Sequence, residues 1–135
     1  MSGQAALRGA IVAGLAADPA LLALIGGPRI HDGAPRGCPH PFVELGAVET
    51  RLLTAERGEG ERHAVDIHVL SRRPARGEVA AILDAIEAAL PTLAAHLVGH
   101  RLIHIADPVS RSERLRNGRT WRGRLSVRIV TEPLA

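Results

Sequence analysis

An amphipathic helix over residues 78–90 constrains the fold of this chain more than any other segment. Apolar residues recur there at positions i, i+3, i+4, i+7 and i+11, which is the period of one helix face, and acidic residues occupy other positions. A helix with a single apolar face must bury that face against another layer of structure. The apolar positions are Val79, Ile82, Leu83, Ile86 and Leu90.

Segments with the two-residue period of a β-strand supply that layer. Apolar and polar residues alternate in four stretches, and turn-forming residues separate them. Consecutive strands joined by hairpins form an antiparallel sheet, and one apolar face per strand calls for helices on one side. The four predicted strands are 42–48, 65–69, 101–106 and 121–129.

The N-terminal part of the chain predicts two further helices. Apolar residues repeat at three- and four-residue steps over residues 4–17. Asp18 is a good N-cap and Pro19 is tolerated at the first helical position, so a second helix starts there and ends at Gly26 and Gly27. Charged residues interrupt this apolar region before about 18 residues accumulate, so we expect neither a signal peptide nor a membrane span, and a cytosolic protein.

The length of 135 residues fits one domain with a two-layer core. Phe42 and Trp121 are the only aromatic side chains other than histidine, so Ala, Val, Leu and Ile must build the core. We expect one α+β domain over residues 1–135, with an antiparallel four-stranded sheet and helices packed on one face; residues near Ile30 can add a short edge strand. The expected core includes Val65, Ile67, Val69, Val79, Ile82, Ile86, Ile103, Leu125 and Val127.

Charge is distributed unevenly along the chain. Residues 101–128 hold eight arginines against two acidic residues, whereas residues 44–66 hold six acidic residues against three arginines. The polar stretches 49–62 and 107–120 within these segments predict long loops. Copies of such a domain could therefore dock head to tail, acidic patch against basic patch.

No catalytic constellation is recognisable. His96, His100 and His104 have the four-residue spacing of helical metal ligands, but Gly99 ends that helix and the three rings should diverge. Cys38 and His40 lie in a proline-rich loop and could form a nucleophile and its base, but no motif in the sequence indicates the acid that would orient the histidine or an oxyanion hole. The chain contains no GxSxG, HExxH or phosphate-binding loop motif. We expect no enzyme, no metal and no cofactor, and we rank a metal-dependent hydrolase third among the possible functions.

Nucleic-acid binding is the second possibility, and it rests on arginine. Alternate residues Arg122, Arg124 and Arg128 would place basic groups on one face of the last strand. A basic loop would add Arg111, Arg114, Arg116 and Arg119. Base recognition usually adds stacking aromatic side chains, and the sequence offers none beside Trp121. A solvated strand face with a salt-bridged subunit interface therefore explains these arginines better than a small basic nucleic-acid-binding module.

The layout as a whole resembles the tail-terminator, or tail-completion, proteins of long-tailed phages and of gene transfer agents. The resemblance covers nearly the whole chain, and its motifs describe a fold and not a reaction. It rests on Asp18-Pro19-Ala20-Leu21, Gly26-Gly27-Pro28-Arg29-Ile30, Pro41-Phe42-Val43, and Val65-Asp66-Ile67-His68-Val69-Leu70-Ser71 leading into Glu78–Leu90.

This resemblance implies a structural subunit of a homo-oligomeric ring, usually a hexamer. Such a ring terminates the phage-like tail tube and joins it to the head-side connector or stopper protein. It implies the tail tube protein, the connector or stopper and other copies of the chain as partners. DNA passes through the channel without sequence-specific contact, and no membrane is involved. The protein is then expected in the bacterial cytoplasm during assembly and afterwards at the head–tail junction of the particle.

A cyclic ring needs two different, complementary patches on each subunit. The two oppositely charged polar stretches meet that need, so we expect them at the assembly interface or the channel. The predicted interface residues are Glu56, Arg57, Glu59 and Glu61 in the first stretch and Arg111, Arg114, Arg116 and Arg119 in the second.

Overall fold

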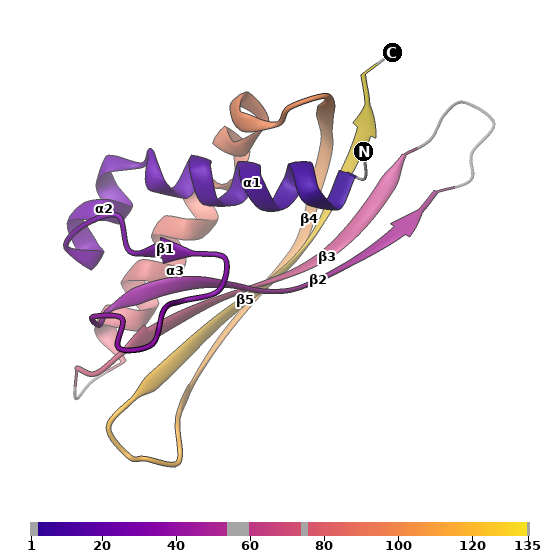
Figure 1. Ribbon diagram of the computed structural model, residues 1–135. Helices are drawn as coiled ribbons and strands as arrows, with labels where there is room; N and C mark the ends of the chain where they lie inside the picture. The colour runs from indigo at the N-terminus through magenta and orange to yellow at the C-terminus, as the bar shows by residue number, and fades with distance from the viewer. Residues whose placement is uncertain (1–2, 54–59, 74–75, 135) are drawn as a thin grey trace.

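The computed structural model describes residues 3–53, 60–73 and 76–134 and shows helices packed on one face of a long, twisted sheet (Figure 1). The sheet has five strands in the order β1-β2-β3-β5-β4. All neighbouring strands are antiparallel except β1 and β2, which are parallel. The elements are α1 (Gly3–Ala16), α2 (Pro19–Ile25), β1 (Ile30–His31), β2 (Phe42–Leu52), β3 (Glu61–Ser71), α3 (Gly77–Ala89), the 3-10 helix η1 (Leu90–His96), β4 (His100–Arg114) and β5 (Trp121–Pro133).

The core lies between the helices and the central strands β3 and β5. Alternate residues of both strands face the helices, and Ile67 and Leu125 are fully buried opposite each other in register. From the helix side, Ile82 and Ile86 of α3 are also fully buried. The helical stretch 77–96 is long and apolar enough to cross a membrane by length and composition, but α3 packs its apolar face on the sheet, as the core helix of a folded domain does.

The junction of α1 and α2 has the predicted capping geometry. The Asp18 carboxylate accepts a hydrogen bond from the Leu21 N–H at 3.0 Å, and Pro19 is the first residue of α2. Gly26 ends the helix with a φ of 80°, a left-handed conformation that glycine adopts without a steric penalty. The two predicted N-terminal helices are therefore confirmed.

The short edge strand predicted near Ile30 is confirmed as β1, which makes five strands where the core prediction had four. Two other details of the predicted sheet are wrong. The sheet is mixed and not wholly antiparallel, because β1 pairs in parallel with β2 through Ile30 and Val43. Residues 49–52 and 107–114 of the two polar stretches are strand, since β2 and β4 run much further than the apolar alternation does. These strand ends contain polar residues on both faces because most of their side chains are exposed.

Ile103 is the one predicted core residue that is not buried; its side chain is 48% exposed, whereas the other eight are buried. It lies in β4, an edge strand, at a break in the pairing register between Leu102 and His104. Such a bulge displaces the extra residue from the regular in–out alternation. Leu102 and Ile105 pack against the core instead.

Candidate functional site

The sheet separates the two predicted interface segments. Glu61 starts β3 and pairs with Thr131, whereas Ser71 ends β3 and pairs with Trp121. At the usual rise per residue the two ends of β3 lie about 33 Å apart. Leu52 at the end of β2 and Glu61 at the start of β3 thus lie at one end of the sheet, and the connection 115–120 lies at the other (Figure 1). Glu56, Arg57 and Glu59 lie outside the described residues.

Glu61 is held within its own subunit. Its carboxylate accepts a hydrogen bond from the Gly3 N–H at 3.1 Å and lies 4.0 Å from His100 Nε2. Only 15% of its side chain is exposed. This carboxylate therefore fixes the start of α1 to the sheet, which leaves little of it available to another subunit.

A buried histidine lies beside this contact. His63 is fully buried, and its Nδ1 and Nε2 atoms lie 2.8 and 2.9 Å from the hydroxyl oxygens of Thr50 and Thr131. Burial lowers the pKa of His63, and the nearby Glu61 carboxylate opposes that shift only in part. The ring is thus held in its neutral form between two hydroxyls and links β2, β3 and β5.

At the opposite end, Arg116 and Arg119 lie in the turn between β4 and β5. The Asn117 side-chain oxygen accepts hydrogen bonds from the N–H groups of Arg119 and Thr120, both at 2.9 Å. Gly118 adopts a φ of 71°. The turn predicted at Asn117-Gly118 is therefore confirmed, and its internal hydrogen bonds hold the backbone that carries these arginines.

The connection between β3 and α3 places three further arginines beside this turn and the neighbouring Trp121: Arg72, Arg73 and Arg76. The guanidinium carbons of Arg76 and Arg114 each lie 4.9 Å from the centre of the Trp121 ring, which is within cation–π distance. A pocket of about 390 Å³ opens beside them. We call Arg72, Arg73, Arg76, Arg114 and Arg119 the arginine cluster.

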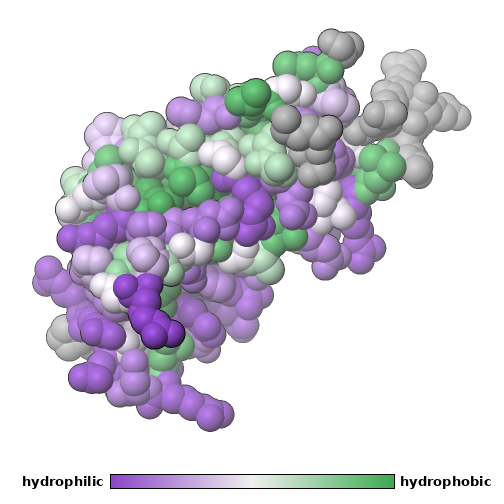
Figure 2. Space-filling model, in the orientation of Figure 1, coloured by the Kyte–Doolittle hydropathy of each residue, from purple (hydrophilic) through white to green (hydrophobic). Residues whose placement is uncertain are grey.

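Sequence reasoning missed Arg72, Arg73 and Arg76, because only the pairing of β3 with β5 brings their connection beside the β4–β5 turn. Residues at this end of the molecule are strongly hydrophilic in Figure 2.

Ion pairs neutralise much of the sheet face that the helices leave open. Arg124 lies 3.6 Å from the Asp66 carboxylate, and Arg128 lies 4.0 Å from Asp107. Arg122 forms an ion pair with Glu113. This pattern favours the salt-bridged strand face over a continuous basic stripe.

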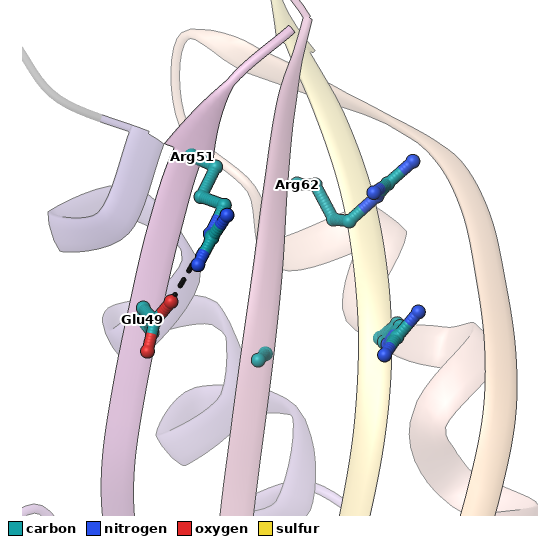
Figure 3. A pocket seen from close by; sticks show the side chains of 5 residues that line it. Glu49, Arg51 and Arg62 are labelled. Carbon is teal, nitrogen blue, oxygen red and sulfur yellow. Dashed lines mark hydrogen bonds and ion pairs between the residues drawn. The ribbon is translucent and has the colours of Figure 1, made fainter.

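The same face carries a shallow hollow of about 290 Å³, shown in Figure 3. Glu49 and Arg51, two of its lining residues on β2, form an ion pair along that strand at 3.1 Å. Arg62, Ala64 and Arg128 complete its lining. Arg111 lies on the neighbouring part of β4, exposed and opposite Arg124 in register.

The described residues offer little for catalysis. They contain no group of three His, Cys, Asp or Glu side chains that could hold a metal ion. The Cys38 sulfur lies 3.4 Å from His31 Nε2, and burial raises the pKa of the Cys38 thiol, which disfavours the reactive thiolate. The arrangement presents charged surfaces at the ends and on the open face of the sheet.

Comparison with known proteins identifies the fold. The model of the family described as tail completion protein gp17 matches residues 9–132. A chain from the virion of a native gene transfer agent particle superposes with a TM-score of 0.70 and 24% identity, over 97% of this chain and 98% of that one. The gp17 protein of bacteriophage SPP1 superposes with a TM-score of 0.58 and 19% identity, over 97% and 90%. No curated protein sequence matches. On the strength of the match over residues 9–132, this chain belongs to the tail completion protein gp17 family.

Proposed function

We propose that this protein is the subunit of a ring that ends a phage-like tail tube and joins it to the head-side connector. The family match over residues 9–132 carries the proposal, and the similarity in fold to a chain of a gene transfer agent particle supports it. The family consists of structural tail proteins, in keeping with a site built from charged surfaces. Its partners are then other copies, the tail tube protein and the connector or stopper, at the head–tail junction of the particle.

Electron microscopy of particles made without this protein tests the role directly. Tails of uncontrolled length, or tails that fail to join heads, are the expected result. Restoring the wild-type chain in the same strain should restore normal particles, which controls for effects on neighbouring genes. Normal particles in the absence of the protein would contradict the proposal.

We further propose that subunits associate by charge. The basic segment around Arg111, Arg114 and Arg116 would meet the acidic connection between β2 and β3 of the next copy. Leu52 and Glu61, which flank the acidic connection, lie at the opposite end of the sheet from the turn between β4 and β5. This separation supports the proposal, because a closed ring requires each copy to present two different patches to its two neighbours. Arg119 belongs to the same basic segment.

Charge reversal tests this association. Individual exposed charges contribute on the order of 0–1 kcal/mol, so several must change together. Replacing Arg111, Arg114 and Arg116 by Glu should reduce the oligomer in sedimentation at low salt. Adding Glu56→Arg and Glu59→Arg should partly restore it; Glu61 is left intact in that variant because it binds the Gly3 N–H.

The matched control reverses three exposed arginines outside both polar stretches, Arg36, Arg101 and Arg128, and should leave the oligomer unchanged. An oligomer that survives the first triple reversal at both low and moderate salt contradicts charge pairing. That result would leave the role in tail completion standing, since the particle phenotype tests it separately.

A further inference from the structure

The arginine cluster concentrates uncompensated positive charge in one place. Among the described residues its only ion pair joins Arg73 to Glu78, at 3.0 Å. Five positive charges thus face one negative charge, in contrast to the paired arginines of the open sheet face. Such a surplus raises the local concentration of anions and favours a ligand that carries several negative charges.

The geometry suits oxyanions. Four members of the cluster line a pocket of about 390 Å³ together with Gly118 and Trp121, namely Arg72, Arg73, Arg114 and Arg119. Contact with the Trp121 ring restrains the guanidinium groups of Arg76 and Arg114, which reduces the conformational freedom lost on binding. A guanidinium group presents paired N–H donors that match the oxygens of a phosphate or a carboxylate.

The surroundings of Arg72, Arg73 and Arg76, which lie outside the basic segment proposed for subunit contact, favour phosphate over a protein partner. The cores of protein interfaces usually contain apolar or aromatic anchors. Trp121 is only 7% exposed, and no exposed large apolar side chain of the described residues lines the pocket. Binding to DNA phosphates needs no such anchor, because charge neutralisation and counterion release supply the affinity. The buried ring also leaves little surface on which a base could stack.

We propose that the arginine cluster binds the backbone phosphates of duplex DNA without reading the base sequence. This inference goes beyond the proposed function, since neither ring formation nor tail termination requires a contact with DNA. It also differs from the basic strand face and basic loop considered from the sequence, because the connection between β3 and α3 contributes Arg72, Arg73 and Arg76 beside Arg114 and Arg119.

Trp121 makes the test specific to the site. It is the only tryptophan, and the chain contains no tyrosine, so intrinsic fluorescence reports on the cluster alone. We would titrate the full chain with a mixed-sequence duplex of about 20 base pairs and follow both Trp121 emission and duplex anisotropy. With four phosphate contacts, the association constant should fall about 150-fold between about 50 and 200 mM salt. Duplexes of different sequence should bind alike.

Neutralising two members of the cluster should weaken this salt dependence. For Arg72→Gln with Arg114→Gln, two contacts remain and the fall over the same salt range should be about 12-fold. Arg51→Gln with Arg101→Gln is the matched control. It removes the same charge, but Arg101 pairs with Glu132 at the far end of β5, and its salt dependence should equal that of the wild type. Far-UV circular dichroism and melting temperature verify that each variant is folded.

Three results would overturn the inference. The first is no binding of the duplex at about 50 mM salt. The second is an equal loss of binding in the control variant, which would mean attraction by net charge and no localised site. The third is tighter binding of polyglutamate than of the duplex with the same dependence on Arg72 and Arg114, which would assign the cluster to an acidic protein partner.

Discussion

Replacing Gly123 by Ala should destabilise the protein, although alanine is ordinarily the better residue in a strand. Gly123 faces the core from β5, and a Cβ atom there would lie 2.5 Å from Val79 Cγ1 and 2.9 Å from Leu83 Cδ1. Overpacking of this kind costs about 1–3 kcal/mol. Alanine also reduces the conformational freedom of the unfolded chain, which stabilises the folded state by about 0.5–1 kcal/mol. We therefore expect the free energy of unfolding to fall by up to about 2.5 kcal/mol, the difference between these two effects.

Val79→Ala tests whether the clash with Val79 causes the loss of stability in Gly123→Ala. Alone it removes two buried methyl groups and should cost about 2 kcal/mol. In the double variant the new methyl group at position 123 occupies part of the vacated space. The double variant should then be more stable than the sum of the single effects predicts, by about 1 kcal/mol. Urea denaturation followed by circular dichroism and Trp121 fluorescence, at fixed protein concentration, measures all four proteins. A Gly123→Ala variant more stable than wild type, or strictly additive effects, would refute the close packing of α3 on β5.

The remaining predictions concern the core and pH. Ile82→Ala should cost about 2–5 kcal/mol, whereas Ile103→Ala, at an exposed edge position, should cost less than about 0.5 kcal/mol in the same urea assay; equal costs would contradict the assigned burial. Burial lowers the pKa of His63, and likewise those of His40 and His68, so below about pH 6.5 the unfolded chain binds protons more readily and stability should fall as the pH drops. His63→Gln should flatten that fall in urea midpoints measured between about pH 7 and 5, and an unchanged slope would argue against His63 as its source.

Local patterns predicted the elements whose burial is regular. The apolar face of α3 repeats with the helical period because every apolar position on it packs against the sheet. The start of α2 was equally readable, since the Asp18 carboxylate and Pro19 act within one turn of chain. Such patterns depend only on residues that are close in sequence, so they can be recognised without knowledge of the tertiary structure.

The ends of the strands were not predictable in the same way. Beyond the helix layer, β2 and β4 expose polar residues on both faces, so the alternation that marks a strand disappears while the backbone pairing continues. The prediction that Ile103 is buried was wrong for a related reason. A bulge in an edge strand changes which side a residue faces, and nothing in the local sequence marks that bulge.

The candidate site shows most clearly which features could not be predicted from the sequence. Sequence alone predicted the charge contrast between the two polar segments and the turn at Asn117-Gly118. It could not place Arg72 and Arg76 beside Arg114, because that neighbourhood depends on the pairing of Ser71 with Trp121, fifty residues away. Sites formed by non-local pairing leave no fixed spacing in the sequence.

The antiparallel pairing also explains why charge accumulates where it does. On the open face of the sheet, cross-strand neighbours place Arg122 beside Glu113 and Arg124 beside Asp66, and these pairs neutralise each other. At the end of the sheet the strands stop, so arginines in the connections have fewer cross-strand partners. The connection between β3 and α3 and the turn between β4 and β5 are therefore the places where this fold can hold surplus charge for an external ligand.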